Sequence, residues 1–308
     1  MSAAGFSLPA FAKVNLDLRV LGLRPDGYHD LRTVFQALAL HDTVSFVPRR
    51  GRFVIECDDP DVPTDRRNLV WKAASLLWRS ARAGRAAEPR DVLIRLAKRI
   101  PAEAGLGGGS ADAAMALVGL SRVWGLDVDL ATLSRLGARV GADVPFFLVG
   151  GTALGLGRGD DIYPLADLPR VHVVVVRPGF GVATAEAYGW FDGEPRRRRL
   201  PTPRPVPGHW PAWATTLRND LEPAVVRHHP TIGRIRQALL ESGAVLAAMS
   251  GSGSAVYGLF ERREAARRTA SDLARPGWRV VETRTLSRTE YTAKLRPALA
   301  GSRISRIS

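Results

Sequence analysis

Alternating apolar and polar positions predict a strand over residues 11–21. Every second residue from Val14 to Val20 is apolar, and polar residues occupy the positions between them. Because successive side chains of a strand point to opposite faces, the pattern predicts a half-buried strand with one polar face. The same reasoning predicts further strands at residues 52–57, 92–96, 171–176, 245–249, 255–260 and 279–286.

Apolar residues at helical spacing predict several helices. Asn68 is a suitable N-cap for an amphipathic helix that ends near Gly84. The spacing from Thr184 to Tyr188 is that of neighbours on one helix face. The other predicted helices cover residues 110–124, 130–140, 221–229, 231–242 and 261–273.

Strands and helices alternate along the chain, which predicts a mixed α and β protein. A boundary near Leu165 separates a predicted N-terminal domain, residues 1–165, from a predicted C-terminal domain, residues 166–296. Residues 195–211 are rich in proline and arginine, so an exposed loop is predicted there. Residues 297–308 are predicted to form a disordered tail.

The formal net charge of +14 invites comparison with nucleic-acid-binding proteins. Nine of these charges lie in two segments without acidic residues: five arginines in 195–207, and one lysine and three arginines in 294–308. The rest of the chain carries the remaining five. It shows no interleaved basic and aromatic residues of the kind found in single-strand binders. The charge therefore favours a small anionic substrate over a nucleic acid.

The single cysteine, Cys57, excludes an intramolecular disulfide and a cysteine-rich metal cluster. No run of about 20 apolar residues occurs, as a membrane span would need. The first residues do not resemble a secretory signal. We therefore expect a cytoplasmic protein with no membrane partner.

A glycine-rich segment at residues 101–117 reads PAEAGLGGGSADAAMAL, with Ser110 expected to open a helix. Glycines let backbone N–H groups approach an anion, and a helix N-terminus adds unpaired donors and a positive dipole end. The segment lacks the Gly-Lys-Ser/Thr of a Walker A loop, the third glycine of a dinucleotide fingerprint and the last glycine of a nucleophile elbow. It predicts a phosphate-binding loop; the alternative is a capped helix after a tight turn.

A second cluster, SGSGS at residues 250–254, lies between two predicted strands. Alone it would be a hairpin loop, and it gains functional weight only beside the first cluster.

Several motifs together resemble a known family. PAEAGLGGGSADAA resembles the ATP-phosphate motif of GHMP kinases, and AMSGSGSAVYGLF resembles their C-terminal glycine motif. AFAKVNLDLRVLGLRPDGYHDLRTVFQAL, GADVPFFLVGGTALGLGRGD and RNDLEP resemble the branch that phosphorylates the cytidine diphosphate conjugate of methylerythritol. The resemblance runs from Leu8 to about Leu286. It implies an α+β fold of two domains with the active site in the cleft between them, and a monomer or weak homodimer.

The resemblance implies that Asp143 is the general base and that Lys13 neighbours it, stabilising charge on the transferring group. Without the family match, Asp143 would be a turn residue before Pro145, and Lys13 a solvated strand lysine.

The resemblance also assigns substrate contacts. Tyr28 would stack on the cytosine, His29 would hydrogen-bond it, and Tyr188 would form a second aromatic wall. Thr184 and Asn15 would meet the substrate as well. Core packing is the alternative for the two tyrosines.

The ATP side follows the same resemblance, with Lys98 contacting the adenosine. Magnesium is expected with ATP, with the Ser110 hydroxyl as a candidate contact, but no set of metal ligands is evident. The implied ATP-binding residues are Lys98, Pro101, Ala102, Glu103, Ala104, Gly105, Leu106, Gly107, Gly108, Gly109, Ser110 and Ala111.

Two other functions stay open at this point. Another GHMP kinase would act on homoserine, mevalonate or a sugar, but such substrates have no cytosine for the Asp-Gly-Tyr-His element to stack on. A basic RNA-binding module is the alternative outside enzymes.

Overall fold

The computed structural model describes residues 5–81, 88–194 and 216–299. The loop predicted at residues 195–211 lies outside this part of the chain, as do residues 300–308 of the predicted tail. Among the described helices, none is long and apolar enough to cross a membrane.

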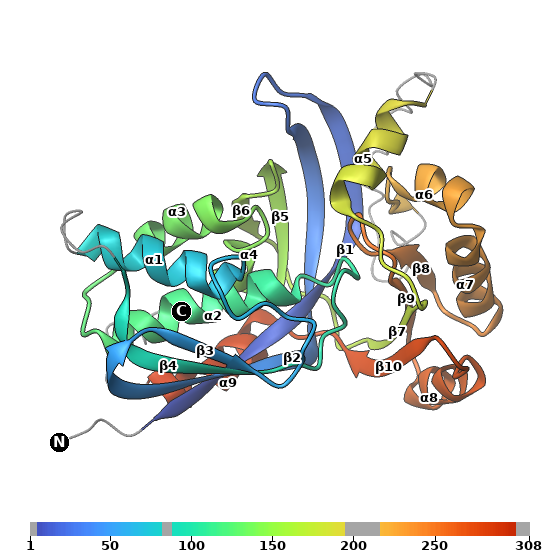
Figure 1. The fold of residues 1–308 in the computed structure, drawn as a ribbon. Coiled ribbons are helices and arrows are strands. Elements are labelled where there is room, and N and C mark those ends of the chain that lie inside the picture. Colours follow the sequence, from blue (N-terminus) through green and yellow to red (C-terminus); the bar gives the residue numbers. More distant parts are fainter. Residues whose placement is uncertain (1–4, 82–87, 195–215, 300–308) are drawn as a thin grey trace.

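A long antiparallel hairpin runs through the centre of the molecule (Figure 1). It consists of β1 (Phe6–Leu23) and β2 (His29–Arg52). Gly27 in the connecting turn has a φ of 81°, which glycine adopts without steric cost. Register shifts on either side of Lys13 and Asn15 interrupt the pairing. Such bulges bend a strand and change where its side chains point, and they are common beside active sites.

The N-terminal half of the chain completes a sheet and its helical layer. Its further elements are β3 (Val54–Cys57), α1 (Leu69–Ala81), β4 (Arg90–Ala97), α2 (Gly108–Val123), α3 (Leu130–Val140), α4 (Phe146–Val149), β5 (Thr152–Gly157) and β6 (Asp161–Pro164).

This first sheet has the order β3-β4-β2-β5-β6, with β1 also paired to β2. β3 and β4 are parallel and α1 connects them, whereas the other neighbours are antiparallel. The buried helix α2 packs on β1, β2 and α1. Its alanine-rich sequence lets it lie close to the sheet: a Cβ at Gly119 would stand 2.1 Å from the Phe46 ring.

The C-terminal half forms a second, smaller sheet with its own helices (Figure 1). The sheet order is β10-β7-β9-β8, and every neighbouring pair is antiparallel. The elements are β7 (His172–Arg177), α5 (Thr184–Asp192), α6 (Glu222–His228), α7 (Pro230–Glu241), β8 (Leu246–Met249), β9 (Val256–Phe260), α8 (Arg263–Asp272), β10 (Arg279–Arg284) and α9 (Arg288–Leu299).

A shared apolar core joins the two halves. Val14 and Leu16 of β1 pack with Val173 and Val175 of β7 and with Tyr257 of β9, and all five side chains are buried. The second sheet therefore covers the apolar face that alternation predicts for β1. The resulting architecture is α+β, as predicted. The exact division at residue 165 stays a prediction.

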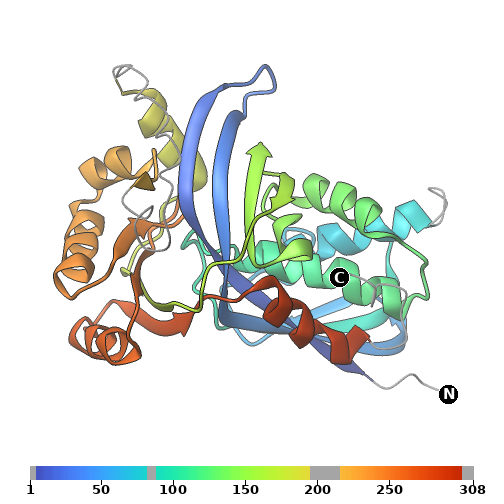
Figure 2. The ribbon, with the colours of Figure 1, turned by 180° about the vertical axis from the view of Figure 1, so that it is seen from behind.

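The last helix returns to the N-terminal half, as the view from behind shows (Figure 2). Tyr291 of α9 is buried beside Phe11, with ring centroids 5.0 Å apart, and its hydroxyl donates to the Phe147 carbonyl at 2.7 Å. α9 continues to Leu299, so its last three residues overlap the segment 297–308, whose disorder stays a prediction. This contact joins residues far apart in sequence, and periodicity near residue 296 does not reveal it.

Two local predictions are wrong. The polar side chains of Lys13, Asn15 and Asp17 are buried, at 3%, 3% and 4% exposure, so β1 is buried on both faces here. α2 begins at Gly108, and Gly107 occupies the N-cap position in place of Ser110.

The long strand β2 has no counterpart among the predicted elements, although Val44 and Phe46 lie on its buried face with the period of a strand.

Candidate active site

A buried lysine and a half-buried aspartate form an ion pair between β1 and the turn before α4. The Nζ of Lys13 lies 3.1 Å from an Oδ of Asp143 and donates to Oδ1 of Asn15 at 2.6 Å. The Lys13 backbone N–H donates to the Leu106 carbonyl at 3.0 Å, which ties the strand to the glycine-rich loop. The Asp143 side chain is 33% exposed. A carboxylate open to a ligand beside a fixed ammonium can accept a proton from a bound hydroxyl.

Hydrogen bonds fix Asn15 from both sides. Its Nδ2 donates to Oγ1 of Thr33 at 2.7 Å, and the Thr33 hydroxyl donates to the Asp17 carbonyl at 2.7 Å. The Tyr257 hydroxyl donates to the Asn15 carbonyl at 3.0 Å. Lys13 therefore donates to an acceptor that is itself held by hydrogen bonds, and its ammonium lies between Asn15 and Asp143.

The glycine-rich segment leads into α2 as the sequence predicts. Gly107 has a φ of 74°, and a Cβ there would stand 2.6 Å from the Phe147 ring and 3.1 Å from Cγ of Lys13. Within the described chain, no side chain caps the helix. The first N–H groups of any α-helix have no acceptor within the helix, and the helix dipole favours an anion beside them, so the start of α2 is suited to a phosphate.

The two glycine clusters meet backbone to backbone. Ser250 donates from its hydroxyl to the Gly105 carbonyl at 2.9 Å. A Cβ at Gly105 would stand 1.9 Å from the Ser250 carbonyl oxygen, and one at Gly253 would stand 2.2 Å from the Gly105 nitrogen. Gly251 has a φ of 58° and lies beside Lys13 and Asn15. The second cluster is thus part of the same site.

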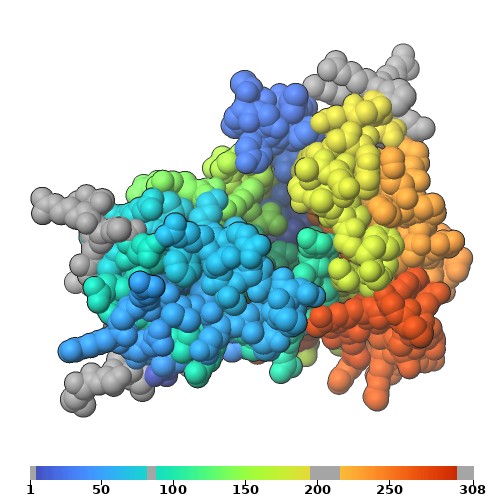
Figure 3. Space-filling view, in the orientation of Figure 1, coloured from blue at the N-terminus to red at the C-terminus, as the bar shows by residue number. Residues whose placement is uncertain are grey.

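A hollow is visible between the β1–β2 hairpin and α5 (Figure 3). These two elements carry the residues His29, Thr184 and Tyr188, which are expected to bind the substrate. The His29 ring stacks on the Tyr188 ring with centroids 4.6 Å apart, and its Nε2 bonds an Oδ of Asp192 at 2.9 Å. Thr184 bonds Ser252 of the second glycine cluster through their hydroxyls at 2.9 Å. Burial, with added repulsion from Asp143 and Asp192, raises the pKa of Tyr188, so its hydroxyl remains a hydrogen-bond donor.

Tyr28 lies apart from this stack. Its ring is 58% exposed at the hairpin turn, and the Arg158 guanidinium lies 5.3 Å from the ring centroid. Among the predicted substrate residues, the structure therefore joins His29 to Tyr188, Thr184 to the second glycine cluster and Asn15 to Lys13, whereas Tyr28 contacts none of them.

Lys98 follows β4 and precedes the glycine-rich loop, and two carboxylates form ion pairs with its ammonium. Its Nζ bonds Asp42 and lies 2.5 Å from Oδ2 of Asp112 in α2. Asp42 also accepts the backbone N–H groups of Arg99 and Ile100 at 2.5 and 2.8 Å. The cluster therefore clamps the entry of the glycine-rich segment to the helix at its exit. Contact between Lys98 and adenosine stays a prediction.

The remaining predicted ATP-binding residues follow the chain from this clamp into α2. Glu103 has a φ of 52°, an uncommon conformation for a residue with a side chain. Pro101, Ala104, Leu106 and Ala111 are buried, Ala102, Glu103 and Gly109 are exposed, and Gly105, Gly107, Gly108 and Ser110 lie between these extremes.

The buried cluster makes a pH-dependent stability prediction. Burial, with added repulsion from Asp42 and against the attraction of Lys98, raises the pKa of Asp112 to about 7. The folded protein then holds a proton that the unfolded chain has already lost, so the contribution of Asp112 to stability falls as pH rises from about 4 to about 7. Asp112→Asn cannot lose a proton. We expect thermal unfolding midpoints to fall less steeply from about pH 5 to about pH 8 in the variant than in the wild type; parallel curves would contradict this.

No group of three or more His, Cys, Asp or Glu side chains suited to a metal occurs among the described residues. Magnesium commonly keeps its waters and is held by substrate phosphates with one or two protein oxygens. The side-chain oxygens of Ser110, in the first turn of α2, and of Asp143, beside Lys13, are suited to be the one or two protein ligands of a phosphate-bound magnesium ion. They do not make up a complete set of protein ligands.

Sequence reasoning missed several residues of the site. Thr33, Asp42 and Asp112 are buried polar groups whose partners lie on other elements. Asp192 of α5 is the partner of His29, at the other end of a helix from Thr184. Spacing alone offers no signal for such pairs, because each joins distant parts of the chain.

Comparison with known proteins now gives the family. The GHMP kinase N-terminal domain model matches residues 68–151, and the GHMP kinase C-terminal model matches residues 208–277. A 4-diphosphocytidyl-2-C-methyl-D-erythritol kinase of Synechococcus sp. strain JA-3-3Ab is 42% identical over 280 residues, covering 87% of this chain and 89% of the relative.

Solved structures agree with that result. A crystal structure of a 4-(cytidine 5'-diphospho)-2C-methyl-D-erythritol kinase matches with a TM-score of 0.74 at 36% identity, covering 91% of this chain and 99% of the other. A homoserine kinase from Cytophaga hutchinsonii shares the fold, with a TM-score of 0.67 at 19% identity. The resemblance read from the sequence is confirmed: this chain belongs to the 4-diphosphocytidyl-2-C-methyl-D-erythritol kinases, a branch of the GHMP kinase family.

Proposed function

We propose that this chain transfers the γ-phosphoryl group of ATP to the 2-hydroxyl of 4-diphosphocytidyl-2-C-methyl-D-erythritol, in the non-mevalonate pathway of isoprenoid synthesis in the cytoplasm. The observation that carries the proposal is the Lys13–Asp143 pair, 3.1 Å apart, beside the uncapped N-terminus of α2. The names of the relatives supply the substrate.

The reaction needs the hydroxyl oxygen to bond the γ-phosphorus while the bond from that phosphorus to the bridging oxygen of ADP breaks. Asp143 accepts the hydroxyl proton and later releases it to solvent. Lys13 stabilises negative charge on the transferring group from its fixed position. Phosphoryl transfer depends mainly on positioning and charge stabilisation, which is what a buried, hydrogen-bonded ammonium provides.

The glycine-rich segment binds the ATP phosphates through the N–H groups of the first turn of α2, which have no acceptor within the helix. Magnesium, held by those phosphates with Ser110 or Asp143 nearby, would neutralise their charge. The clamp of Asp42, Lys98 and Asp112 keeps both ends of this segment at a fixed separation.

The cytidine end lies toward the hairpin turn. Tyr188 offers a wall across from the β1–β2 hairpin, and His29 lies against it with its Nε2 held by Asp192. Tyr28 projects from the adjoining turn, so the base stacks on its exposed ring while His29 reads a polar edge.

An assay of ADP release across candidate alcohols tests the proposal. We expect turnover with 4-diphosphocytidyl-2-C-methyl-D-erythritol and little with homoserine, mevalonate or galactose. Turnover with one of the latter, and none with the cytidylyl compound, would contradict it. A parallel RNA-binding titration at rising salt tests the nucleic-acid alternative, since such binding weakens steeply with salt.

Tyr28→Ala should weaken binding of the cytidylyl substrate by roughly 1–3 kcal/mol, the scale of a base–aromatic stack. ATP affinity should barely change. The matched control is Tyr163→Ala, which removes another exposed tyrosine, 54% exposed on β6. Titration of both ligands measures this; loss of ATP binding with the cytidylyl substrate spared would reverse the assignment of the two ends.

A further inference from the structure

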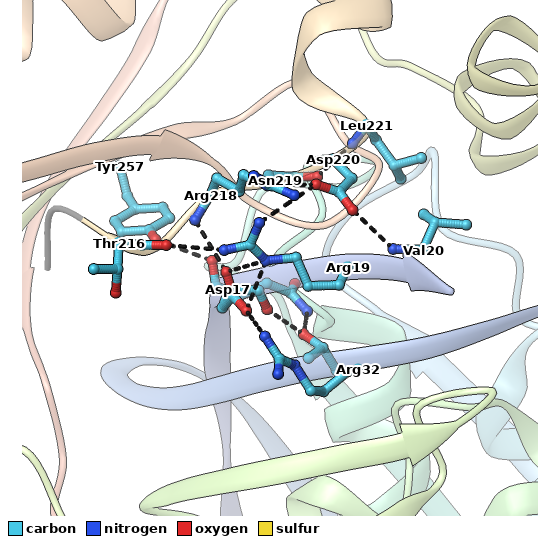
Figure 4. Close-up of polar contacts among 12 residues, drawn as sticks. Asp17, Arg19, Val20, Arg32, Thr216, Arg218, Asn219, Asp220, Leu221 and Tyr257 are labelled. Carbon is cyan, nitrogen blue, oxygen red and sulfur yellow. Dashed lines mark hydrogen bonds and ion pairs between the residues drawn. The ribbon is translucent and has the colours of Figure 1, made fainter. Parts of the chain in front are cut away.

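The RNDLEP motif, residues 218–223, has no role in the reaction described above, yet it lies at the joint between the two halves of the molecule. It runs beside β1 and leads into α6, whose first two residues it includes (Figure 4). Leu18 donates its N–H to the Arg218 carbonyl and accepts the Asp220 N–H, both at 2.9 Å. The motif therefore pairs with the strand that carries Lys13.

Polar side chains strengthen this pairing (Figure 4). Asp17 accepts the Arg218 N–H at 3.0 Å and the Arg19 guanidinium at 2.8 Å. Asp220 accepts the Val20 N–H at 3.1 Å. Burial raises the pKa of Asp17, although Arg19 opposes this. A register between motif and strand is thus set by several buried contacts.

Asn219 points the other way, toward the second glycine cluster. Its Nδ2 donates to the Met249 carbonyl at 2.9 Å and to the Gly251 carbonyl at 2.6 Å, and its Oδ1 accepts the Leu221 N–H at 3.0 Å. The side chain is 5% exposed. One buried amide therefore satisfies two carbonyls of the loop and one N–H of its own turn.

The loop that Asn219 holds flanks the reacting groups. A Cβ at Gly251 would stand 3.3 Å from Nζ of Lys13 and 3.2 Å from Oδ1 of Asn15. The same loop bonds Thr184 through Ser252 and Gly105 through Ser250. A shift of this loop would change the surroundings of Lys13, the phosphate loop and α5 together.

We propose that Asn219 is a positioning residue for phosphoryl transfer: it fixes the second glycine loop, residues 250–254, at the register relative to β1 that keeps Lys13 directed at Asp143. This inference rests on the proposed function for its kinetic consequence. No other neutral side chain of this length offers two N–H donors and an acceptor. An aspartate of the same shape would set a carboxylate against two carbonyl oxygens.

Asn219→Asp tests the role, with Asp220→Asn as the matched control. Asp220 belongs to the same motif, but in the described part of the chain its carboxylate contacts Val20, Arg218 and Arg19 and not the glycine loop. We expect Asn219→Asp to lower kcat by about 10- to 100-fold, since a misplacement of about 1 Å has such effects, with KM for both substrates within a few-fold. Asp220→Asn should lower Tm but keep kcat.

Two additions keep the result decisive. Asn219→Ser retains one donor and should lose less kcat than Asn219→Asp, so it serves if the aspartate variant does not fold. Hydrogen exchange of the amides of Ser250, Gly253 and Ala255, which bond within or across the loop, should speed up in the Asn219 variants and not in Asp220→Asn.

Hydrogen exchange of the loop amides distinguishes failure of the proposed function from failure of the positioning role of Asn219. If the wild type does not phosphorylate the cytidylyl alcohol, the proposed function fails, while faster loop exchange in the variants would still support the positioning of the loop. A folded Asn219 variant with wild-type kcat and wild-type loop exchange would overturn the inference. So would an equal loss of kcat in Asp220→Asn.

Discussion

Asp143→Asn should lower turnover by about 10²–10⁴, the usual contribution of a general base, while both substrates still bind within a few-fold. The substitution keeps the size and shape of the side chain but removes the proton acceptor and the charge that pairs with Lys13 at 3.1 Å. The loss should fall on the chemical step, because Asp143 accepts the proton only as the hydroxyl oxygen bonds the γ-phosphorus. Phosphoryl transfer is partly dissociative and proton removal comes late, which places the loss toward the lower end of this range. Single-turnover kinetics measures this directly.

Lys13→Ala should slow the same step, since it removes the buried ammonium beside Asp143. Because the two residues act as a unit, the double variant should fall far short of the product of the two single losses. The hydrogen bond from Lys13 to Asn15 is lost as well, so Tm is measured in parallel to show that the variants are folded.

Asp129→Asn is the matched control for Asp143→Asn. Asp129 caps α3 by accepting the Thr132 N–H at 2.8 Å, and asparagine caps a helix equally well. Its turnover should equal that of the wild type. A chemical step in Asp143→Asn within a few-fold of wild type would remove Asp143 from the mechanism.

Gly105→Ala should lower kcat/KM for ATP by about 10²-fold or more. A Cβ there would lie 1.9 Å from the Ser250 carbonyl oxygen, and both partners are backbone, so one glycine loop must move away from the other. The φ of 72° adds strain of about 1 kcal/mol or more. A displacement of about 1 Å at the phosphate loop suffices for such a loss. Steady-state kinetics with ATP varied measures it, together with Tm.

Gly125→Ala separates the clash from the strain. Gly125 has a similar φ of 63°, but a Cβ there meets no atom within 4 Å, and it lies at the far end of α2. That variant should lose stability by a similar strain and keep its kinetic constants. If Gly105→Ala resembled it in kcat/KM, contact between the two glycine loops would not matter for catalysis.

Local patterns in the sequence were sufficient for much of the fold. The alternation at β1, the glycine cluster that leads into α2, and the helical spacing of Thr184 and Tyr188 in α5 are each visible within about ten residues. These features depend on backbone preference and on which face is apolar, and neighbours along the chain decide both.

The motifs also indicated the family before any contact was known, and the comparisons confirm it. The roles of individual site residues are different, because they came from resemblance. The structure brings Lys13 to Asp143 and His29 to Tyr188, while the catalytic and binding roles stay predictions until the kinetics above are measured.

Tertiary structure alone decided where the polar residues lie. A buried, paired lysine and a solvated one look the same in an alternating pattern, so alternation alone put Lys13 and Asn15 on the polar face of a half-buried strand, and only the family resemblance placed Lys13 beside Asp143. Burial of such groups is tolerated only when partners satisfy them, and the partners come from β2, the turn before α4 and the second sheet. Three further contacts also join residues far apart in sequence: the hydrogen bonds from Ser250 to Gly105, from Asn219 to Gly251 and from Tyr291 of α9 to Phe147. Sequence periodicity reports what one segment prefers, whereas these contacts depend on how the two sheets and their loops come together.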